Sequence, residues 1–433
     1  MNGRGRRFLK CEAWLLFLLA AILVASPTWA DAQKIVAAVD AAADSCKVVS
    51  QKIFEWKELG QQEFKSSQLL MEELKKLGYK VSGDLKVPED LIKGGISKTA
   101  FRAEMAGKGP GPTVTIMLEY DALPNGHSCG HNLIATSGLL AAAALAKVMP
   151  ETPGRVLVIG TPDEERGSLG GGKVCLLEGG HFEGSDVVLI THPGDDWSLD
   201  QRMLAVKRAI FYFKGKAAHA AAAPHKGISA LDAVMLTFYG VDMLREHVRQ
   251  DVRMHGIIIK GGVAANIVPE FAQAEFMVRA LDTTTMETTY EKVVNCARAG
   301  ALATGATLEF KPPRVALPAP TTVPEYISLV RKNMLAVGVP ESEFKTREDF
   351  GSSDLAAVGH RYPTVNLRFK IAPEGTAGHS DAFRDASGTE EAWKATVVAG
   401  KAVALAAYEL LTNPDKVKAI KAQFAEVKAK EGK

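Results

Sequence analysis

Five side chains with metal-ligand chemistry follow three successive predicted strands in this 433-residue chain. Cys129 and His131 lie two residues apart, the pair Glu164–Glu165 follows the next strand, and His192 ends the strand after that. Thiolate, imidazole and carboxylate groups are the ligands that first-row divalent metals take from proteins. Their delivery at successive strand ends predicts a metal site built by a sheet. A spare carboxylate beside a metal indicates activation of water for hydrolysis.

The spacing of Cys129 and His131 sets a condition on the local structure. Residues two apart point the same way in extended chain but not on a helix, so we expect an extended loop before the following helix. A lone cysteine is more often a small buried apolar residue. The flanking imidazoles of His127 and His131 favour the metal-ligand interpretation.

The acid doublet Glu164–Glu165 predicts a division of roles. Adjacent acids usually form a solvated surface. These two follow a buried strand and precede the glycines Gly170–Gly172. One carboxylate can bind metal while its neighbour transfers protons. His379, far along the chain, says little by itself, and His219 falls in a different predicted domain.

A glycine-rich segment close by nearly fits a phosphate-binding loop. Gly167–Lys173 has the spacing, but Val174 stands where a Ser or Thr would hold magnesium. The preceding acids would also repel phosphate. Nucleotide binding is therefore disfavoured.

The elements around these residues predict a doubly wound α/β catalytic domain. Thr113–Leu118, Arg155–Ile159 and Asp186–Ile190 are short apolar runs of the kind buried in parallel sheets. An Ala/Leu-rich helix is expected over Leu133–Val148. Ligands of such a fold collect beyond the carboxyl ends of the strands, where the candidate site residues lie.

The middle of the chain predicts a separate domain with the order βαββαβ, a ferredoxin-like unit inserted in the α/β layer. We expect a signal peptide over 1–30, the catalytic domain over 31–205 and 319–433, and the inserted lid over 206–318. The lid strands are expected at Lys207–Phe213, Gly256–Lys260, Ala272–Val278 and Thr307–Phe310, and its helices at Ser229–Val248 and Thr285–Ala303.

The first thirty residues resemble a secretory signal. A basic segment ending at Lys10 precedes the apolar run Ala13–Ala25, and Thr28–Ala30 is a plausible cleavage site. The run is short for a membrane span, which argues against an uncleaved anchor. Without residues 1–30 the chain has 48 basic and 49 acidic residues. We therefore expect a periplasmic or secreted protein without affinity for nucleic acid or membrane. Four cysteines remain, at spacings that fix no disulfide framework.

Taken together, these residues resemble the co-catalytic metallopeptidase and aminoacylase family. The similarity extends to the amidohydrolase branch with the indole-acetyl-amino-acid hydrolases, aminobenzoyl-glutamate hydrolase and the aminoacylase-like dipeptidases, and it covers nearly the whole chain after residue 30. The matching segments, in chain order, are Glu58–Phe64, Asp121–Pro124, Gly126–His131, Glu164–Glu165 and the lid motif Gly261–Pro269.

The resemblance implies a hydrolase of amide bonds in N-acyl amino acids, aminobenzoyl-glutamate-like compounds or dipeptides, with two divalent ions of zinc, manganese or cobalt. Glu164 would be the general base, and the Cys129 thiolate would bridge the metals. His219 and Asn266 would reach the substrate from the lid, which would form a homodimer and carry His219 into the neighbouring site. The implied metal ligands are Cys129, His131, Glu165, His192 and His379.

Two departures bear on the substrate. Asn132 stands where the indole-acetyl subgroup has Asp, and Gly351–Asp354 replaces a different loop. Both are similar to the aminobenzoyl-glutamate hydrolase and dipeptidase side of the branch. Arg279, on a lid strand, is a candidate donor to a substrate carboxylate.

Two other classes of protein stay open as alternatives. A non-catalytic metal or peptide-binding protein could keep the same fold, but it would be expected to have lost Glu164 or a ligand. A purely structural metal protein would show four closed ligands and no spare carboxylate.

Overall fold

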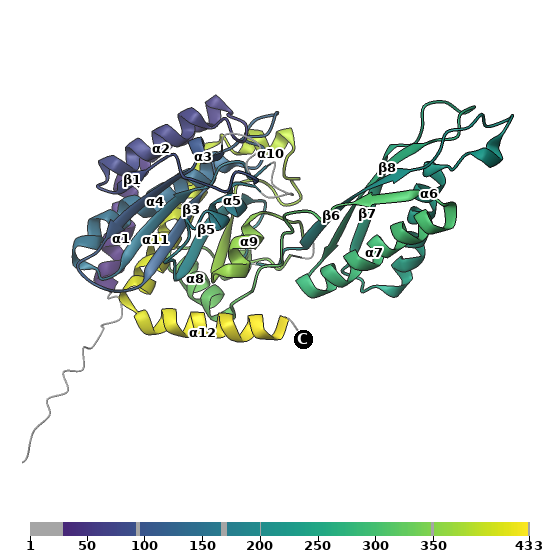
Figure 1. Cartoon of the computed structure of the whole chain (residues 1–433). Helices are drawn as coiled ribbons and strands as arrows, with labels where there is room; N and C mark the ends of the chain where they lie inside the picture. The colour runs from purple at the N-terminus through teal and green to yellow at the C-terminus, as the bar shows by residue number, and fades with distance from the viewer. Residues whose placement is uncertain (1–28, 92–95, 166–170, 200, 348–349, 432–433) are drawn as a thin grey trace, which may run out of the picture.

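The computed structural model describes residues 29–91, 96–165, 171–199, 201–347 and 350–431. Residues 1–28, which hold most of the expected signal peptide, lie outside these ranges. Trp29 and Ala30 begin the first described helix, α1 (Trp29–Trp56). The described chain forms a large α/β domain and a smaller domain that projects from it (Figure 1).

The larger domain is built on a six-stranded sheet with the strand order β1-β2-β4-β3-β5-β10. The four strands from β4 to β10 pair in parallel, as the sequence predicts. The two strands at the other edge, which sequence reasoning missed, pair antiparallel. The strands are β1 (Lys80–Ser82), β2 (Phe101–Ala106), β3 (Thr113–Leu118), β4 (Arg155–Gly160), β5 (Val187–Gly194) and β10 (Thr364–Lys370).

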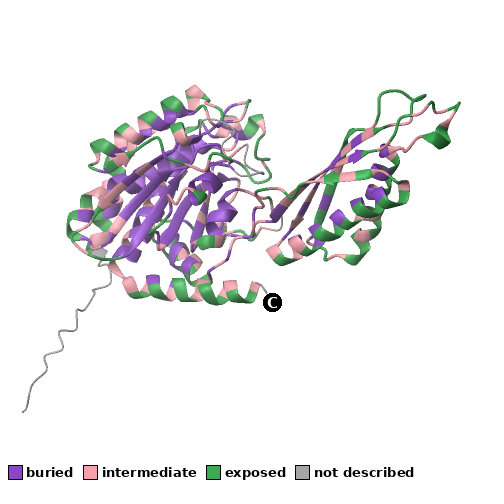
Figure 2. Cartoon of the chain, in the orientation of Figure 1, coloured by how far each residue is buried: buried purple, intermediate pink, exposed green. Residues whose placement is uncertain are grey.

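Helices cover both faces of this sheet, and successive strand residues therefore enter different cores. Ile116 packs in the core beneath α1, α4 (His131–Val148) and α11 (Glu390–Thr412), whereas Met117 packs against α5 (Gly172–Glu178) and α9 (Leu355–Arg361). The central strands are buried along nearly their whole length (Figure 2). The doubly wound α/β class is confirmed.

Further helices surround the sheet of the larger domain (Figure 1). α4 and α11 are long and apolar enough to cross a membrane by length and composition, but most of each is buried inside the domain. The other helices of this domain are α2 (Phe64–Lys76), α3 (Ile96–Thr99), α8 (Pro324–Ala336), α10 (Asp381–Ala386) and α12 (Pro414–Glu431). Short 3-10 turns occur at Met149–Glu151 and Glu341–Glu343 in this domain, and at Pro224–Lys226 and Arg245–His247 in the lid.

The smaller domain, here called the lid, is a four-stranded antiparallel sheet with the order β7-β8-β6-β9. Two helices pack on it and enclose a core of their own. Its elements follow the expected βαββαβ order, so the ferredoxin-like insertion is confirmed. They are β6 (Ala205–Lys214), α6 (Ala230–Leu244), β7 (Arg253–Lys260), β8 (Phe271–Ala280), α7 (Thr283–Thr304) and β9 (Thr307–Phe310).

Candidate metal centre and active site

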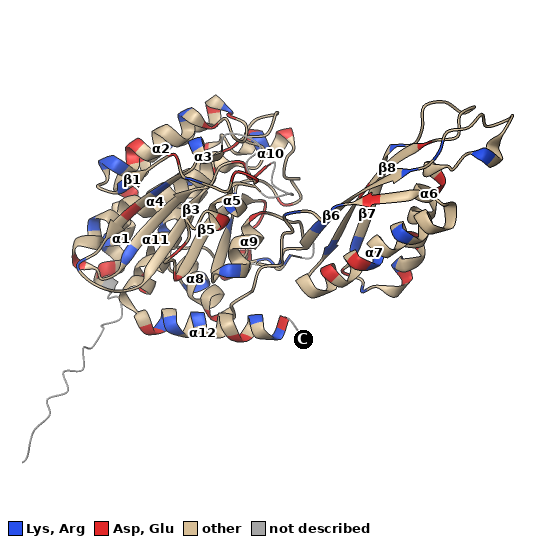
Figure 3. Ribbon diagram, viewed as in Figure 1, with Lys and Arg blue, Asp and Glu red and all other residues tan. Residues whose placement is uncertain are grey.

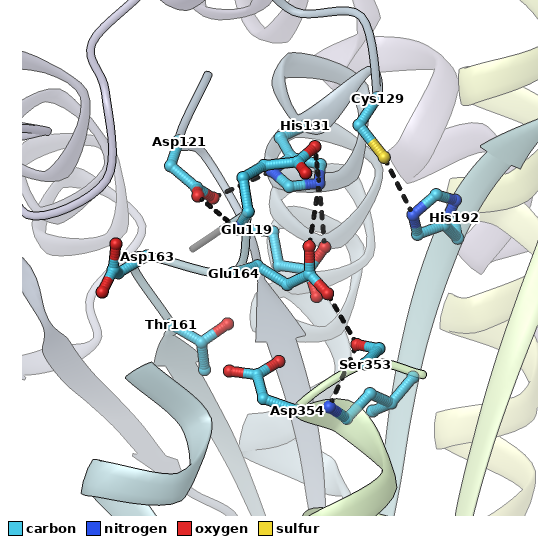
Figure 4. A network of polar contacts seen from close by, with 12 residues as sticks. Glu119, Asp121, Cys129, His131, Thr161, Asp163, Glu164, His192, Ser353 and Asp354 are labelled. Atoms are coloured by element: carbon cyan, nitrogen blue, oxygen red, sulfur yellow. Dashed lines mark hydrogen bonds and ion pairs between the residues drawn. The ribbon is translucent and has the colours of Figure 1, made fainter. Parts of the chain in front are cut away.

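The five predicted metal ligands converge beyond the carboxyl-terminal edge of the parallel strands. Cys129 Sγ lies 3.5 Å from His192 Nε2, and Glu165 carboxylate oxygens lie 3.7 Å from His131 Nε2 and 3.4 Å from His379 Nε2. Figure 4 shows several of these side chains directed at one another. Three groups have ligand atoms within 4.8 Å of one another: Cys129–His131–His192, Cys129–Glu165–His379 and His131–Glu164–Glu165.

A left-handed turn, not extended chain, places Cys129 beside His131. His131 is the first residue of α4, and Gly130 before it has φ 72°. A Cβ on Gly130 would lie 2.5 Å from Pro193 Cγ, so only glycine fits both the backbone and the space. The expected extended loop is therefore wrong. His192 also lies within β5 rather than past its end.

His379 reaches the cluster from the part of the chain that follows the lid. Its φ of 64° is unusual for a residue with a side chain. The conformation is held on both sides of the residue, because His379 N donates to Ser128 O at 2.9 Å and Asn125 Nδ2 donates to His379 O at 3.1 Å. The loop that carries Cys129 thus also fixes His379.

Three buried polar atoms in the cluster have no hydrogen-bond partner among the described residues. They are Glu119 Oε2, His131 Nε2 and Glu165 Oε1. Leaving such atoms unpaired in a protein interior costs free energy. Glu119 Oε2 and Glu165 Oε1 both lie within 3.7 Å of His131 Nε2. A divalent cation among them would satisfy these atoms, so the residues fit a metal site.

The protonation chemistry of the ligands favours the same conclusion. Burial raises the pKa of the Cys129 thiol to about 12 and the pKa of Glu165 to about 7. Burial lowers the pKa of His192 to about 4, which keeps its imidazole neutral. Burial alone would also lower the pKa of His131, but the charge of Asp121 outweighs burial and raises it, so a metal would have to displace a proton from that ring. Metal binding requires a neutral imidazole, a thiolate and a carboxylate. A bound cation would supply the positive charge that stabilises the thiolate and the carboxylate in their ionised forms.

Asp121, two residues beyond Glu119, holds two ligand positions at once. Its Oδ1 lies 2.9 Å from His131 Nδ1, and its Oδ2 accepts a hydrogen bond from Glu165 N at 2.9 Å. Asp121 is buried. A carboxylate behind a ligand imidazole fixes the ring orientation and raises its basicity.

A buried ion network next to the ligand cluster was missed by sequence reasoning. Lys173 is fully buried, and its Nζ lies 2.5 Å from Asp354 Oδ1 and 2.8 Å from Glu119 Oε1. Burial opposes the charge on Lys173, but the two carboxylates outweigh it and raise the pKa of its ammonium. This contact explains the lysine at the end of the glycine-rich segment. The only signal for it in the sequence was a lysine directly before the apolar run Val174–Leu177.

A cavity of about 480 Å³ opens over the ligand cluster. The described residues that line it include Cys129, Glu164 and His192 of the cluster, together with Arg202, Phe350, Arg368 and Phe383. A cavity of this size suits a small molecule.

The three predicted lid residues are not brought to this cavity within one chain. His219 and Asn266 lie together in an exposed part of the lid, where Ala220 N donates to Asn266 O at 3.0 Å. Arg279 lies on β8, with Nη1 3.4 Å from Ser352 Oγ. None of the three is among the described residues that line the cavity. Their roles stay predictions.

Comparison with known proteins identifies the family. Residues 206–304 match the peptidase dimerisation domain of the M20 family. An Xaa-Arg dipeptidase from Mus musculus is 33% identical over 347 residues, which cover 75% of this chain and 78% of the relative. The chain belongs to the M20 peptidase family. One subunit of the p-aminobenzoyl-glutamate hydrolase from Escherichia coli is 34% identical to this M20 chain, over 60% of this chain and 56% of its own.

Solved structures agree with this M20 fold. A dinuclear metal binding M20 peptidase from Bacillus subtilis aligns with a TM-score of 0.65 at 20% identity, over 86% of this chain and 99% of its own. The aminobenzoyl-glutamate utilization protein from Klebsiella pneumoniae aligns with a TM-score of 0.64 at 18% identity, over 86% and 96%. This M20 protein is a metal-dependent hydrolase of amide or peptide bonds, and the expected enzyme class is confirmed.

Proposed function

We propose that this M20 enzyme is an exported, dinuclear-metal amidohydrolase that cleaves an amide bond next to a free carboxylate. One observation carries the metal count: Cys129 belongs both to the group with His131 and His192 and to the group with Glu165 and His379. A thiolate shared by two groups suits a bridge between two ions. The proposed ions are zinc, which thiolate and imidazole ligands suit, manganese, which carboxylate ligands suit, and cobalt.

Glu164 is the proposed general base. It adjoins the ligand Glu165 and lines the cavity, and its Oε2 lies 4.0 Å from His131 Nε2. Metal ions at this site would polarise the amide carbonyl and make water more acidic. Glu164 takes a proton from the attacking water and returns it to the leaving amine nitrogen. This role requires Glu164 to stay off the metal, although it shares a candidate ligand group with His131 and Glu165.

His219 is proposed to act on the active site of a second subunit. Its Nδ1 accepts hydrogen bonds from Ala221 N at 3.2 Å and Ala222 N at 3.1 Å. The neutral ring therefore carries its hydrogen on Nε2, where it can be donated to the oxyanion that forms from the substrate carbonyl. Asn266, beside it on the lid, is proposed to bind the substrate in the same neighbouring site.

The lid supplies the surface for such a homodimer. β7 is an edge strand of the lid sheet. Asp232 and Asp242 are the only charged residues of α6 (Figure 3). Both α6 and β7 carry exposed apolar side chains, which mark an interaction surface. They are Met235, Leu236, Tyr239 and Met243 on α6, and Ile257, Ile258 and Ile259 on β7.

The substrates we propose are N-acyl amino acids, aminobenzoyl-glutamate-like compounds and dipeptides. The relatives named above act on Xaa-Arg dipeptides and on p-aminobenzoyl-glutamate, as their names state. Arg279 is the proposed donor to the substrate carboxylate. The basic segment and apolar run within residues 1–30 support export to the periplasm or the medium.

A substrate screen tests this function. The purified chain without residues 1–30 is loaded separately with zinc, manganese or cobalt and offered the three substrate classes. Hydrolysis of at least one class should require metal, and Glu164→Ala should bind metal normally while kcat falls about 100-fold or more. No hydrolysis of any class by fully metal-loaded protein would contradict the proposal and favour a binding role.

A further inference from the structure

We propose that Ser353 is a positioning residue that orients Glu164 for proton transfer. This inference rests on the proposed role of Glu164 as general base. Ser353 belongs to the segment Gly351–Asp354, which follows the lid in sequence and lies 189 residues from Glu164. Figure 4 shows the two side chains directed at each other.

The hydrogen bond between the two side chains has a defined direction. Ser353 Oγ lies 2.6 Å from Glu164 Oε1. Leu355 N donates to the same Ser353 Oγ at 3.2 Å. A carboxylate only accepts hydrogen bonds, so the single hydroxyl hydrogen of Ser353 points at Glu164. A separation of about 2.5 to 2.7 Å is typical of an O–H donor bound to a charged oxygen.

This bond distinguishes the two oxygens of Glu164. Oε1 is held by Ser353, whereas Oε2 is the oxygen 4.0 Å from His131 Nε2. The oxygen that faces the ligand cluster is therefore the one left for the water proton. Without the serine hydroxyl, the carboxylate could rotate about its last bond and present neither oxygen in a fixed place. Small misplacement of a catalytic group can lower the rate about 100-fold.

The segment that carries Ser353 is anchored on both sides. Leu204, at the entrance to the lid, donates from N to Gly351 O at 2.8 Å and accepts from Ser352 Oγ at 2.8 Å. On the other side, the buried Asp354 accepts hydrogen bonds from the backbone and the side chain of Lys173. Ser353 lies between these anchors. Its hydroxyl therefore has a fixed position from which to hold Glu164.

Kinetics of matched serine variants test the proposal. Ser353→Ala should lower kcat about 10- to 100-fold, with KM and metal content close to wild type, because the hydroxyl acts on Glu164 rather than on the substrate. Ser353→Thr keeps a hydroxyl at the position and should recover most of kcat. Ser185→Ala is the matched control and should keep wild-type kcat, since it removes a buried serine hydroxyl that lies 2.7 Å from Thr115 Oγ1, away from the residues that line the cavity.

The same replacement in a Glu164→Asp variant distinguishes a positioning role of Ser353 from general damage to the fold. In Glu164→Asp the carboxylate is one methylene shorter and out of reach of the Ser353 hydroxyl. Ser353→Ala should then have little further effect on kcat, whereas damage to the fold would lower kcat equally in both backgrounds. An equal loss in both backgrounds, or wild-type kcat for Ser353→Ala, overturns the proposal. An active Glu164→Ala variant would instead overturn the role of Glu164 itself.

Discussion

His131 Nδ1 lies 2.9 Å from Asp121 Oδ1, while its Nε2 is left without a hydrogen-bond partner among the described residues. A carboxylate can only accept, so Nδ1 carries a hydrogen. The charge of Asp121 also overcomes burial and raises the pKa of His131, so Nε2 presents its lone pair to the ligand cluster once a metal displaces the second proton. Asp121 thereby fixes the tautomer that a metal ligand needs.

Replacement of Asp121 should weaken metal binding. In Asp121→Ala the His131 ring loses its partner and Glu165 N loses its acceptor, so we expect metal affinity to fall about 10- to 100-fold. Metal titration followed by calorimetry measures this directly, without any substrate. Asp186→Ala is a matched control, because that carboxylate accepts from Thr113 N at 2.9 Å at the start of β3, the opposite end of the strand from the ligand cluster. Equal metal affinity in the two variants would contradict the role of Asp121.

Replacement of Cys129 should lower metal content and activity together. Thiolates bind borderline metals better than hydroxyls do. Burial already raises the pKa of the Cys129 thiol to about 12, so a bound cation is what would stabilise the thiolate. Cys129→Ser purified under the same conditions should therefore hold less than the wild-type metal content by mass spectrometry. Full occupancy would make Cys129 a packing residue. Cys175→Ser, a buried thiol outside the cluster, serves as control.

Mixed dimers test whether His219 acts across the interface. His219→Ala and Glu164→Ala homodimers should each be inactive. After subunit exchange at equal amounts, half of the dimers are mixed and each mixed dimer has one intact site, so roughly a quarter of wild-type activity should return. Native mass spectrometry verifies the exchange. If exchange is complete and no activity returns, His219 and Glu164 serve the same subunit's site and the dimer is not required.

Glu63 should make stability depend on pH. Its Oε1 accepts from Asp163 N at 2.9 Å, and burial, assisted by the charge of Asp121, raises its pKa to about 8. The folded protein therefore keeps Glu63 protonated where the unfolded chain, with a pKa of 4.5, has released the proton. Because unfolding releases that proton, this contribution to stability is fully present below pH 4.5 and is lost as pH rises towards 8.

Denaturant unfolding of the metal-free protein between about pH 5 and 8 measures the effect. Glu63 contributes a slope of at most about 1.4 kcal/mol per pH unit. Glu63→Gln keeps the shape of the side chain but has no carboxyl group to titrate. The unfolding free energy of this variant should therefore fall less steeply with pH than that of the wild type. Parallel curves for the two proteins would show that Glu63 titrates normally in the folded state.

The amino-acid sequence determined the ligand types, the order of the parallel strands and of the lid elements, and the family of this protein, but not the antiparallel strands β1 and β2. Cys129, His131, Glu165 and His192 could be proposed from sequence because each follows or ends a short apolar run. Parallel strands bring their carboxyl ends to one edge of a sheet. The βαββαβ order of the lid could likewise be predicted from the periodicity of apolar residues, which depends only on residues close together in the sequence.

Only the tertiary structure decided how distant segments complete the centre. Ser353 contacts Glu164 and Asp354 contacts Lys173, although the whole lid separates these residues in the sequence. No local sequence pattern encodes such contacts. Lys173 matched part of a phosphate-binding loop in the sequence, and only its burial between two carboxylates assigns it to an ion network. Periodicity tells which face of an element is apolar. The partners of a buried polar group depend on how the elements pack, and that is decided by the whole fold.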